Sequence, residues 1–173
     1  MSEADLHSRV RLAYAFADEI GLLFSERTFD STEQNLAVAA CKDLCFEHHG
    51  SVVVLIERRR FASAAALIRP MLDALVLAVG IDDGAVKPER ITGLLDGTLE
   101  RPKLDDLINE LAKRNNSLAP ELKLFQKQAL PVLHDYTHGG SRQITRRIRN
   151  GEIGSNTSSD RGLKCCPLVI SLL

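Results

Sequence analysis

The fold is decided by residues 61–79, which read FASAAALIRPMLDALVLAV. Apolar side chains cover nearly every side of a helix with this sequence, and such a helix usually forms the buried centre of a bundle. Three residues interrupt the pattern, namely Arg69, Pro70 and Asp73. Arg69 and Asp73 share one face because they are four residues apart, while Pro70 removes a backbone hydrogen bond and favours a kink. We therefore expect residues 61–79 to form a central helix with a polar cluster in its middle.

The segments on either side also follow the helical spacing of apolar residues. Ser2 and Asp5 resemble a capping box in front of a first helix, and Ser31 or Thr32 is placed to cap a second. No segment alternates apolar and polar residues as a strand does. The sequence predicts an all-α helical bundle of four to six helices. Further helical segments are expected from Pro88, after Pro102, from Pro120 to Gly139-Gly140 with Pro131 as a kink or a new start, and from Arg142 to Asn150.

The composition fits one globular domain. Of the 173 residues, 45% are hydrophobic and 26% are charged, which is ordinary for such a domain. Only 5% are aromatic, so aliphatic residues must form the core, which favours helices over a β-sandwich. The net charge of −1 gives no overall attraction to nucleic acids or anionic membranes. We predict a helical bundle domain over residues 1–154 and an irregular tail over residues 155–173. The apolar end of this tail fits a short buried segment, an interface peptide, an aggregation-prone tail or a truncated, non-native terminus.

The amino-terminal residues and the cysteines bear on the cellular compartment. Residues 1–10 are polar and lack the basic segment and apolar core of a signal peptide. No uncharged apolar run reaches the roughly 20 residues of a membrane span. We therefore expect a cytoplasmic protein that has no membrane partner. Four cysteines should then be reduced thiols: Cys41, Cys45, Cys165 and Cys166.

The densest group of reactive side chains lies in residues 133–142, LHDYTHGGSR. His134 and His138 share one helical face, and Gly139 lets the backbone approach a ligand closely. A histidine held by a carboxylate suits proton transfer. The spacing also suits a metal ion, although a zincin has Glu after the first histidine and Asp135 stands there. A polar seam without chemistry is the third interpretation. Ligands to complete a metal site would be Asp73, Glu57 or His48.

Basic residues next to this segment suggest an anion as the ligand. Arg142, Arg146 and Arg149 form one ridge on the expected helix 142–150, and guanidinium groups bind phosphates well. No aromatic residue lies between them to stack on bases, and a solvated basic face has the same pattern. On the central helix, Arg69 is a second candidate to hold an anion, with Asp73 orienting a histidine. A structural clamp between helices is the alternative for this pair.

A second group of metal-ligand residues lies on the second expected helix. Cys41, Cys45, His48 and His49 form a continuous stripe there. Ligands spread along about 12 Å of one straight helix cannot surround one tetrahedral ion, and structural zinc sites draw ligands from two elements. We interpret the stripe as buried free cysteines with a histidine at their rim, and we expect no metal and no cofactor.

Two of these stretches also resemble a known group of proteins. Residues 65–74 and the segment His134 to Gly140 resemble an uncharacterised bacterial all-helical family with LxRPxxE and HDYTHGG motifs, distantly similar to HEPN domains. The resemblance covers roughly residues 30–150. It implies a helical bundle in which Arg69 and Asp73 face His134, Tyr136 and His138. HEPN ribonucleases of defence systems use an R-x4–6-H motif at a dimer interface, and no arginine stands at that distance before either histidine here.

The leading functional hypothesis is a HEPN-like protein that binds RNA or a phosphate-bearing ligand in a mobile-element or defence context. A homodimer is expected. One alternative is a non-enzymatic dimerising interaction module, and another is a metal-dependent hydrolase built on the histidine pair. Whether the protein is an enzyme is left open. The candidate catalytic residues are His134, His138 and Asp73, and the candidate ligand-binding residues are Arg69, Tyr136, Gly139, Arg142 and Arg146.

Overall fold

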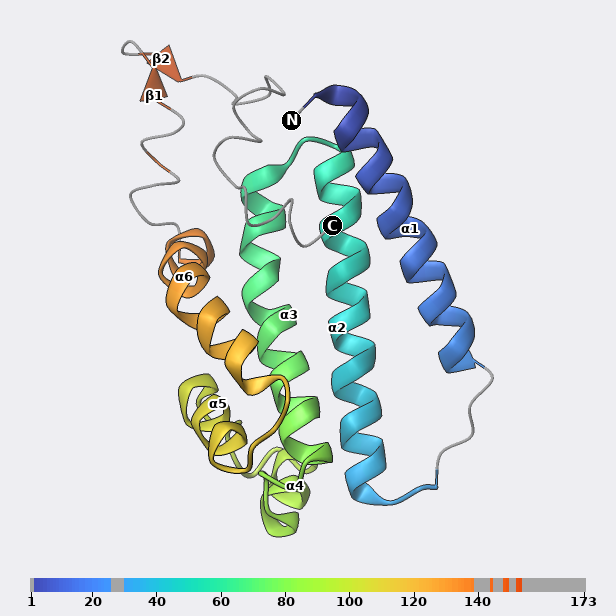
Figure 1. Ribbon diagram of the computed structural model, residues 1–173, viewed down its shortest axis with the longest axis vertical. Helices are drawn as coiled ribbons and strands as arrows, with labels where there is room; N and C mark the ends of the chain where they lie inside the picture. Colours follow the sequence, from blue (N-terminus) through green and yellow to red (C-terminus); the bar gives the residue numbers. More distant parts are fainter. Residues whose placement is uncertain (1, 26–29, 139–143, 145–147, 150–151, 154–173) are drawn as a thin grey trace. The chain divides into compact units, whose positions relative to one another are not determined.

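The computed structural model describes residues 2–25, 30–138, 144, 148–149 and 152–153. Within them the chain is all-α apart from one short strand pair, which confirms the predicted fold class. The six helices are α1 (Glu3–Ser25), α2 (Glu33–Glu57), α3 (Phe61–Asp82), α4 (Pro88–Leu95), α5 (Leu104–Lys113) and α6 (Ala119–Thr137) (Figure 1). The strands β1 (Ile148–Arg149) and β2 (Glu152–Ile153) pair antiparallel, with Ile148 opposite Ile153.

The predicted helix starts are confirmed by their capping contacts. At α1 the backbone N–H of Ser2 donates to Asp5 Oδ2 and that of Asp5 donates to Ser2 Oγ, both at 3.1 Å. At α2 the hydroxyl of Thr32 accepts from the N–H of Asn35 at 3.1 Å. Such side chains satisfy N–H groups that have no partner within the helix.

The end of the helical pattern differs from the prediction. The helix expected over residues 142–150 is wrong at Ile148 and Arg149, which form β1. The spacing of arginines and isoleucines there suits a helix, but two extended residues pair with β2 instead. A ridge of arginines on one helix therefore does not extend to Arg149. Pro70, the expected site of a kink, lies inside α3, and Pro131, the expected kink or new helix start, lies inside α6.

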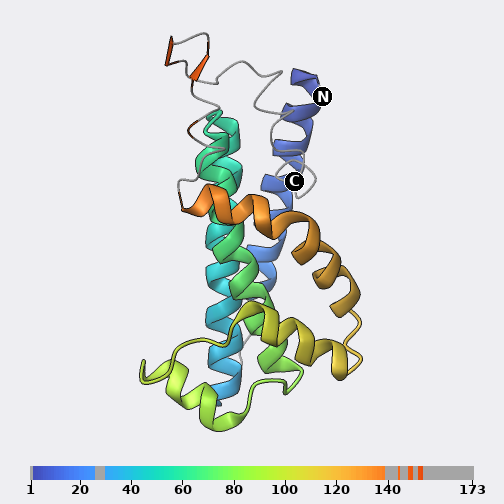
Figure 2. The same cartoon turned by 90° about the vertical axis from the view of Figure 1, so that its left-hand side faces the viewer.

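The chain divides into two compact units, and each is described separately. Unit 1 comprises Met1–Glu26, Glu47–Arg69 and Ala129–Leu173. In it the end of α2 and the start of α3 form a helical hairpin that turns at Arg59, where φ is 57° (Figure 1). The last part of α6 crosses the first part of α3 (Figure 2). The apolar faces of these segments form the core, with Val53, Ile56, Ala64, Ala65 and Ile68 at most 1% exposed.

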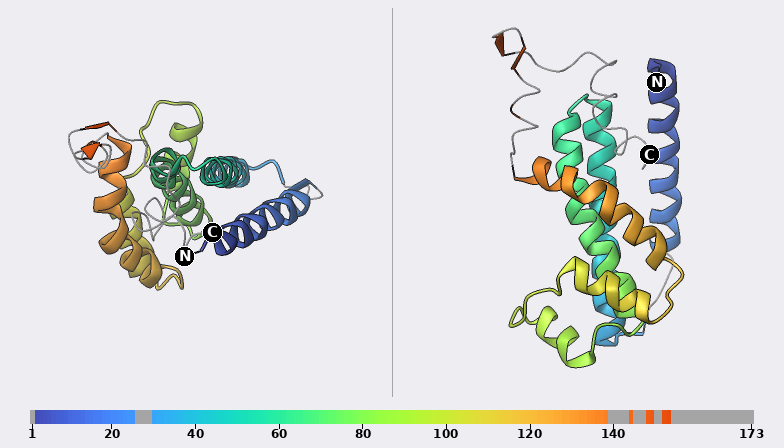
Figure 3. Two further views of the ribbon diagram at one scale, coloured as in Figure 1. Left: turned by 90° about the horizontal axis from the view of Figure 1, so that it is seen from above. Right: turned by 60° about the vertical axis from the view of Figure 1, so that its left-hand side comes forward.

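Unit 2 comprises Arg27–Phe46 and Pro70–Gln128. Here α5 lies beside the first half of α6, joined by a 2.6 Å hydrogen bond from Gln126 to Asp105 (Figure 3). Ile108 and Leu111 of α5 are fully buried. The start of α2 contacts both α3 and α4, because Gln34 donates to the carbonyl of Ile81 and the Thr92 hydroxyl donates to Glu33.

Helix α3 has the buried character that its sequence predicts. Ala64, Ala65, Ile68 and Val76 are at most 1% exposed, while Leu75 is 41% exposed. Among the described helices, α3 is the one that is long and apolar enough to cross a membrane, with a mean hydropathy of 1.9 over its most apolar window. Half of that window is buried inside the protein, and core helices have the same length and composition.

Candidate functional site

The two candidate histidines lie on the last turn of α6 and the residue after it. Their ring centroids are 4.4 Å apart and the rings are tilted by 52°. The N–H of His138 donates to the carbonyl of His134 at 3.1 Å, so the helical turn continues through both residues. Both side chains are exposed. The predicted shared face is confirmed, and it is open to solvent.

Tyr136 lies on another face of the same turn. Its side chain is only 4% exposed, and the neighbouring Leu133 is 2% exposed. The hydroxyl of Thr137 donates to the carbonyl of Leu133 at 2.9 Å, which satisfies it within the helix. Tyr136 thus anchors α6 in the core of unit 1, since positions two residues apart point to different sides of a helix. The phenol and the two imidazoles do not share one surface.

The two charged residues of α3 have different surroundings. Arg69 is half-buried in unit 1. Asp73 belongs to unit 2, where its carboxylate is 10% exposed and pairs with Arg101 Nη2 at 2.8 Å. Arg101 lies between α4 and α5 and is 53% exposed, so water solvates one side of the pair. Sequence reasoning missed Arg101, and no spacing rule would have found it. That Asp73 orients a histidine stays a prediction.

Gly139, Arg142 and Arg146 lie outside the described residues.

The cysteines and histidines of α2 form no metal centre among the residues described. Cys41 and Cys45 are free, half-buried thiols, and burial raises the pKa of each. Burial lowers the pKa of His49, and its Nδ1 is buried without a hydrogen-bond partner. The ring of His49 meets Phe16 of α1 edge to face, with centroids 5.7 Å apart. Across the described ranges, no three His, Cys, Asp or Glu side chains gather closely enough to hold a metal ion.

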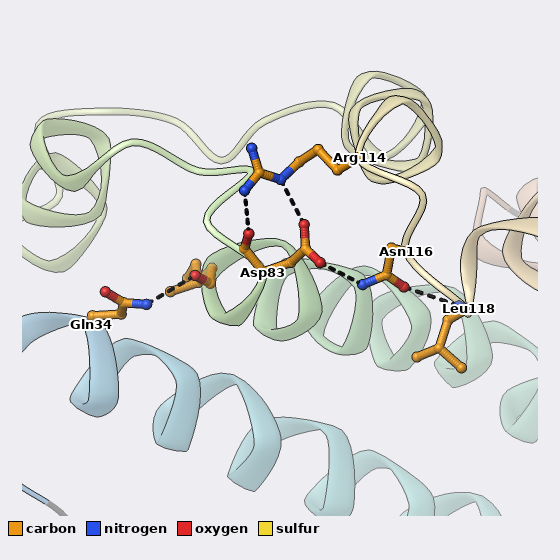
Figure 4. Close-up of polar contacts among 6 residues, drawn as sticks. Gln34, Asp83, Arg114, Asn116 and Leu118 are labelled. Atoms are coloured by element: carbon orange, nitrogen blue, oxygen red, sulfur yellow. Dashed lines mark hydrogen bonds and ion pairs between the residues drawn. The ribbon is translucent and has the colours of Figure 1, made fainter.

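A polar cluster that sequence reasoning missed holds the end of α3 in unit 2 (Figure 4). Asp83 accepts from Arg114 Nε at 2.7 Å and from Asn116 Nδ2 at 2.8 Å, and its carbonyl accepts from Arg114 Nη2 at 2.6 Å. The Oδ1 of Asn116 accepts from the N–H of Leu118 at 3.0 Å, at the start of α6. The Asn116 and Arg114 hydrogen bonds lower the pKa of Asp83. Because the Asp83 carboxylate and the Asn116 amide both bond within the cluster, we interpret it as a structural clamp.

An open hollow of about 610 Å³ lies along α5 in unit 2. Lys113 in its lining bonds Glu110 at 3.1 Å, one helical turn away on the same helix. Surface ion pairs of this kind contribute little to stability. The hollow is lined by Asp106, Asn109, Glu110, Ala112, Lys113 and Lys123.

Taken together, these observations define an all-α protein of six described helices with an exposed histidine pair at the end of α6. The chain belongs to the family of unknown function DUF6988, whose model matches residues 42–158. The match spans α2 from Lys42 onward, α3 to α6 and the histidine segment. No curated protein and no solved structure matches the chain. The family match confirms the expectation of an uncharacterised family, while a relation to HEPN domains stays a prediction.

Proposed function

We propose that the protein binds RNA or another phosphate-bearing ligand through the surface at the end of α6. The observation that carries this proposal is the exposed pair His134 and His138, whose rings lie 4.4 Å apart. Two adjacent imidazoles offer hydrogen-bond donors to phosphate oxygens.

The sequence directly after the pair supports an anionic ligand. Residues 139–150 read GGSRQITRRIRN, with four arginines and no acidic residue. Arginine forms paired hydrogen bonds with phosphate and keeps its charge at all physiological pH values. Chain connectivity keeps Arg142 within a few residues of His138, so imidazole and guanidinium groups are available to one ligand.

The exposure of the histidines favours binding over catalysis. A general acid or base works best in a site that excludes water and fixes its orientation. Here both imidazoles are exposed, and the phenol of Tyr136 is buried on another face. We therefore propose a ligand-binding role for His134, His138, Arg142 and Arg146, with Tyr136 as the residue that anchors α6.

We place this function in the bacterial cytoplasm. The free thiols of Cys41 and Cys45 support a reducing compartment.

The test is an RNA-binding titration over a range of salt concentrations. We expect the wild-type protein to bind short single-stranded RNA, with the logarithm of its affinity falling linearly as the logarithm of salt rises. In the double variant Arg142→Ala, Arg146→Ala, the slope should decrease by about 1.4, since each phosphate contact on a single strand contributes about 0.7. His134→Ala with His138→Ala should weaken binding without lowering the melting temperature, because both side chains are exposed.

His7→Ala is the matched control. His7 is also exposed and lies on α1, where its ring bonds the carbonyl of Glu3. Its loss should leave RNA affinity unchanged. The proposal fails if the wild-type protein binds neither RNA nor inorganic phosphate at low salt, or if the arginine and histidine double variants both bind as tightly as the wild type. Metal analysis of the purified protein tests the hydrolase alternative, which requires a bound ion.

A further inference from the structure

Helix α1 of unit 1 exposes apolar side chains that nothing within the described chain covers. Its inner face buries Leu6, Val10 and Ala13, each at most 5% exposed. Beside that face, Leu12 is 64% exposed and Phe16 is 50% exposed. Single exposed apolar residues are common on protein surfaces. Two large ones on adjacent turns of one helix instead form a continuous apolar strip.

Charges of opposite sign stand at the two ends of this strip. Arg9 precedes Leu12 by three residues and Glu19 follows Phe16 by three, so all four share one stripe of α1. Arg9 lies near Asp5, whose pKa is lowered chiefly by its hydrogen bonds with Ser2 and to a smaller extent by the Arg9 charge. From Arg9 to Glu19 the stripe reads as positive, apolar, apolar, negative, with Asp5 one turn before Arg9.

The order of these four residues is self-complementary when two copies of α1 run antiparallel. Arg9 and Glu19 are each five residues from position 14, and Leu12 and Phe16 are each two residues from it. In an antiparallel pair of α1 helices that cross at residue 14, Arg9 meets Glu19 of the partner subunit at both ends. Leu12 then meets Phe16 of the partner subunit in the middle. A two-fold axis requires a surface of this self-complementary kind.

We propose that the exposed stripe of α1, formed by Arg9, Leu12, Phe16 and Glu19, is the interface of an antiparallel homodimer. The apolar pair supplies the burial and the two charge pairs set the register, as complementary charges do at interfaces. The Phe16 ring stays packed on His49 from one side and accepts the partner's Leu12 on the other. The proposal is independent of RNA binding, since its evidence lies on α1 and its readout is oligomeric state.

The experiment measures the mass of the full-length protein by analytical ultracentrifugation over a range of concentrations. The wild type should be a concentration-dependent dimer. The single variant Arg9→Glu places two carboxylates together at both ends of the interface, and the single variant Glu19→Arg places two guanidinium groups together there. Each variant should weaken the dimer by about tenfold, the order expected when two exposed charge pairs turn repulsive.

Mixing the two variants provides the decisive result. In the proposed register the mixed dimer pairs one carboxylate with one guanidinium group at each end, so mixing should restore the dimer that each single change weakens. The double variant Arg9→Glu, Glu19→Arg restores one positive and one negative group at each end, so it should dimerise with the affinity of the wild type. A purely structural effect of either single change would not be rescued by the other.

The apolar pair is tested separately. Leu12→Asp should abolish the dimer, whereas the matched control Leu124→Asp, at a residue 55% exposed on α6, should not. Circular dichroism checks that each variant is folded.

Three results would overturn the proposal. One is a wild-type monomer at every concentration; flotation with anionic lipid vesicles would then show whether the strip binds a lipid surface instead. Another is a dimer that tolerates Leu12→Asp. The third is a charge-swapped double variant that dimerises no better than the two single variants, which excludes the antiparallel register.

Discussion

A close packing contact that a mutation can probe lies between Gly80 of α3 and Leu107 of α5. A Cβ atom added at Gly80 would come within 2.6 Å of Leu107 Cδ2, far inside ordinary contact distance. Leu107 is 5% exposed, so its side chain has little room to move away. By contrast, a Cβ at Gly50 of α2 meets nothing within 4 Å. Both glycines lie inside helices. Substitution by alanine therefore changes the free energy of unfolding through one contribution that is the same at both sites and one that differs.

The common term is the helical preference of alanine, which stabilises by about 1 kcal/mol relative to glycine. Gly50→Ala should therefore raise the free energy of unfolding by about that amount. At Gly80 the extra methyl group overpacks the core, which costs about 1–3 kcal/mol. Gly80→Ala should then lower the free energy of unfolding by about 1 kcal/mol after the helical gain is included.

Leu107→Val shortens the side chain that collides with the new methyl group. In that background Gly80→Ala should become neutral or stabilising, so the double-mutant cycle should give a coupling energy of about 2 kcal/mol. Urea unfolding followed by far-ultraviolet circular dichroism measures all four proteins and Gly50→Ala. If Gly80→Ala stabilises as much as Gly50→Ala, or if the cycle shows no coupling, Leu107 does not pack over Gly80 and the described contact of α3 with α5 is refuted.

The cap of α2 and the buried titratable groups lead to three shorter predictions. Thr32→Ala should lower the free energy of unfolding, measured in urea, by about 1 kcal/mol, because the Thr32 hydroxyl caps α2. Ser31→Ala should leave it unchanged, and equal losses in the two variants would contradict this assignment. The pKa of His49 is lowered by burial, so the unfolded chain binds a proton at higher pH than the folded protein. Melting temperature should therefore fall as pH drops below about 6.5, and less steeply in His49→Leu; parallel curves would argue against the burial. Burial raises the pKa of Cys41 and Cys45, so both thiols should react with iodoacetamide more slowly in the native than in the denatured protein. Peptide mass spectrometry measures both rates, and equal rates would contradict the burial.

Much of the helical architecture could be predicted from local patterns. The capping box of Ser2 and Asp5, the cap at Thr32 and the buried character of α3 all appear in the structure. The predicted common face of His134 and His138 is also present. These features depend on residues three or four positions apart, and that spacing is fixed once a helix forms.

The candidate site was harder to predict because burial depends on how a helix packs. The family resemblance implied that Tyr136 and the two histidines face one polar cluster, whereas the structure buries the phenol and exposes the imidazoles. Periodicity gives the angle between side chains around a helix, and it does not say which side faces the core when polar and aromatic residues alternate. The strand at Arg149 shows the same limit, since pairing with β2 overrides the local helical pattern.

Local patterns along the chain were enough to predict that it forms helices, where most of them begin, and that residues 61–79 are mainly buried. The pairing of Arg101 with Asp73, and of Arg114 and Asn116 with Asp83, became visible in the folded protein alone. Each of these partners is separated from its aspartate by a long stretch of chain that includes α4 or α5. Helix formation follows from interactions within one turn, whereas these pairings depend on the path of the intervening loops, which no local pattern encodes.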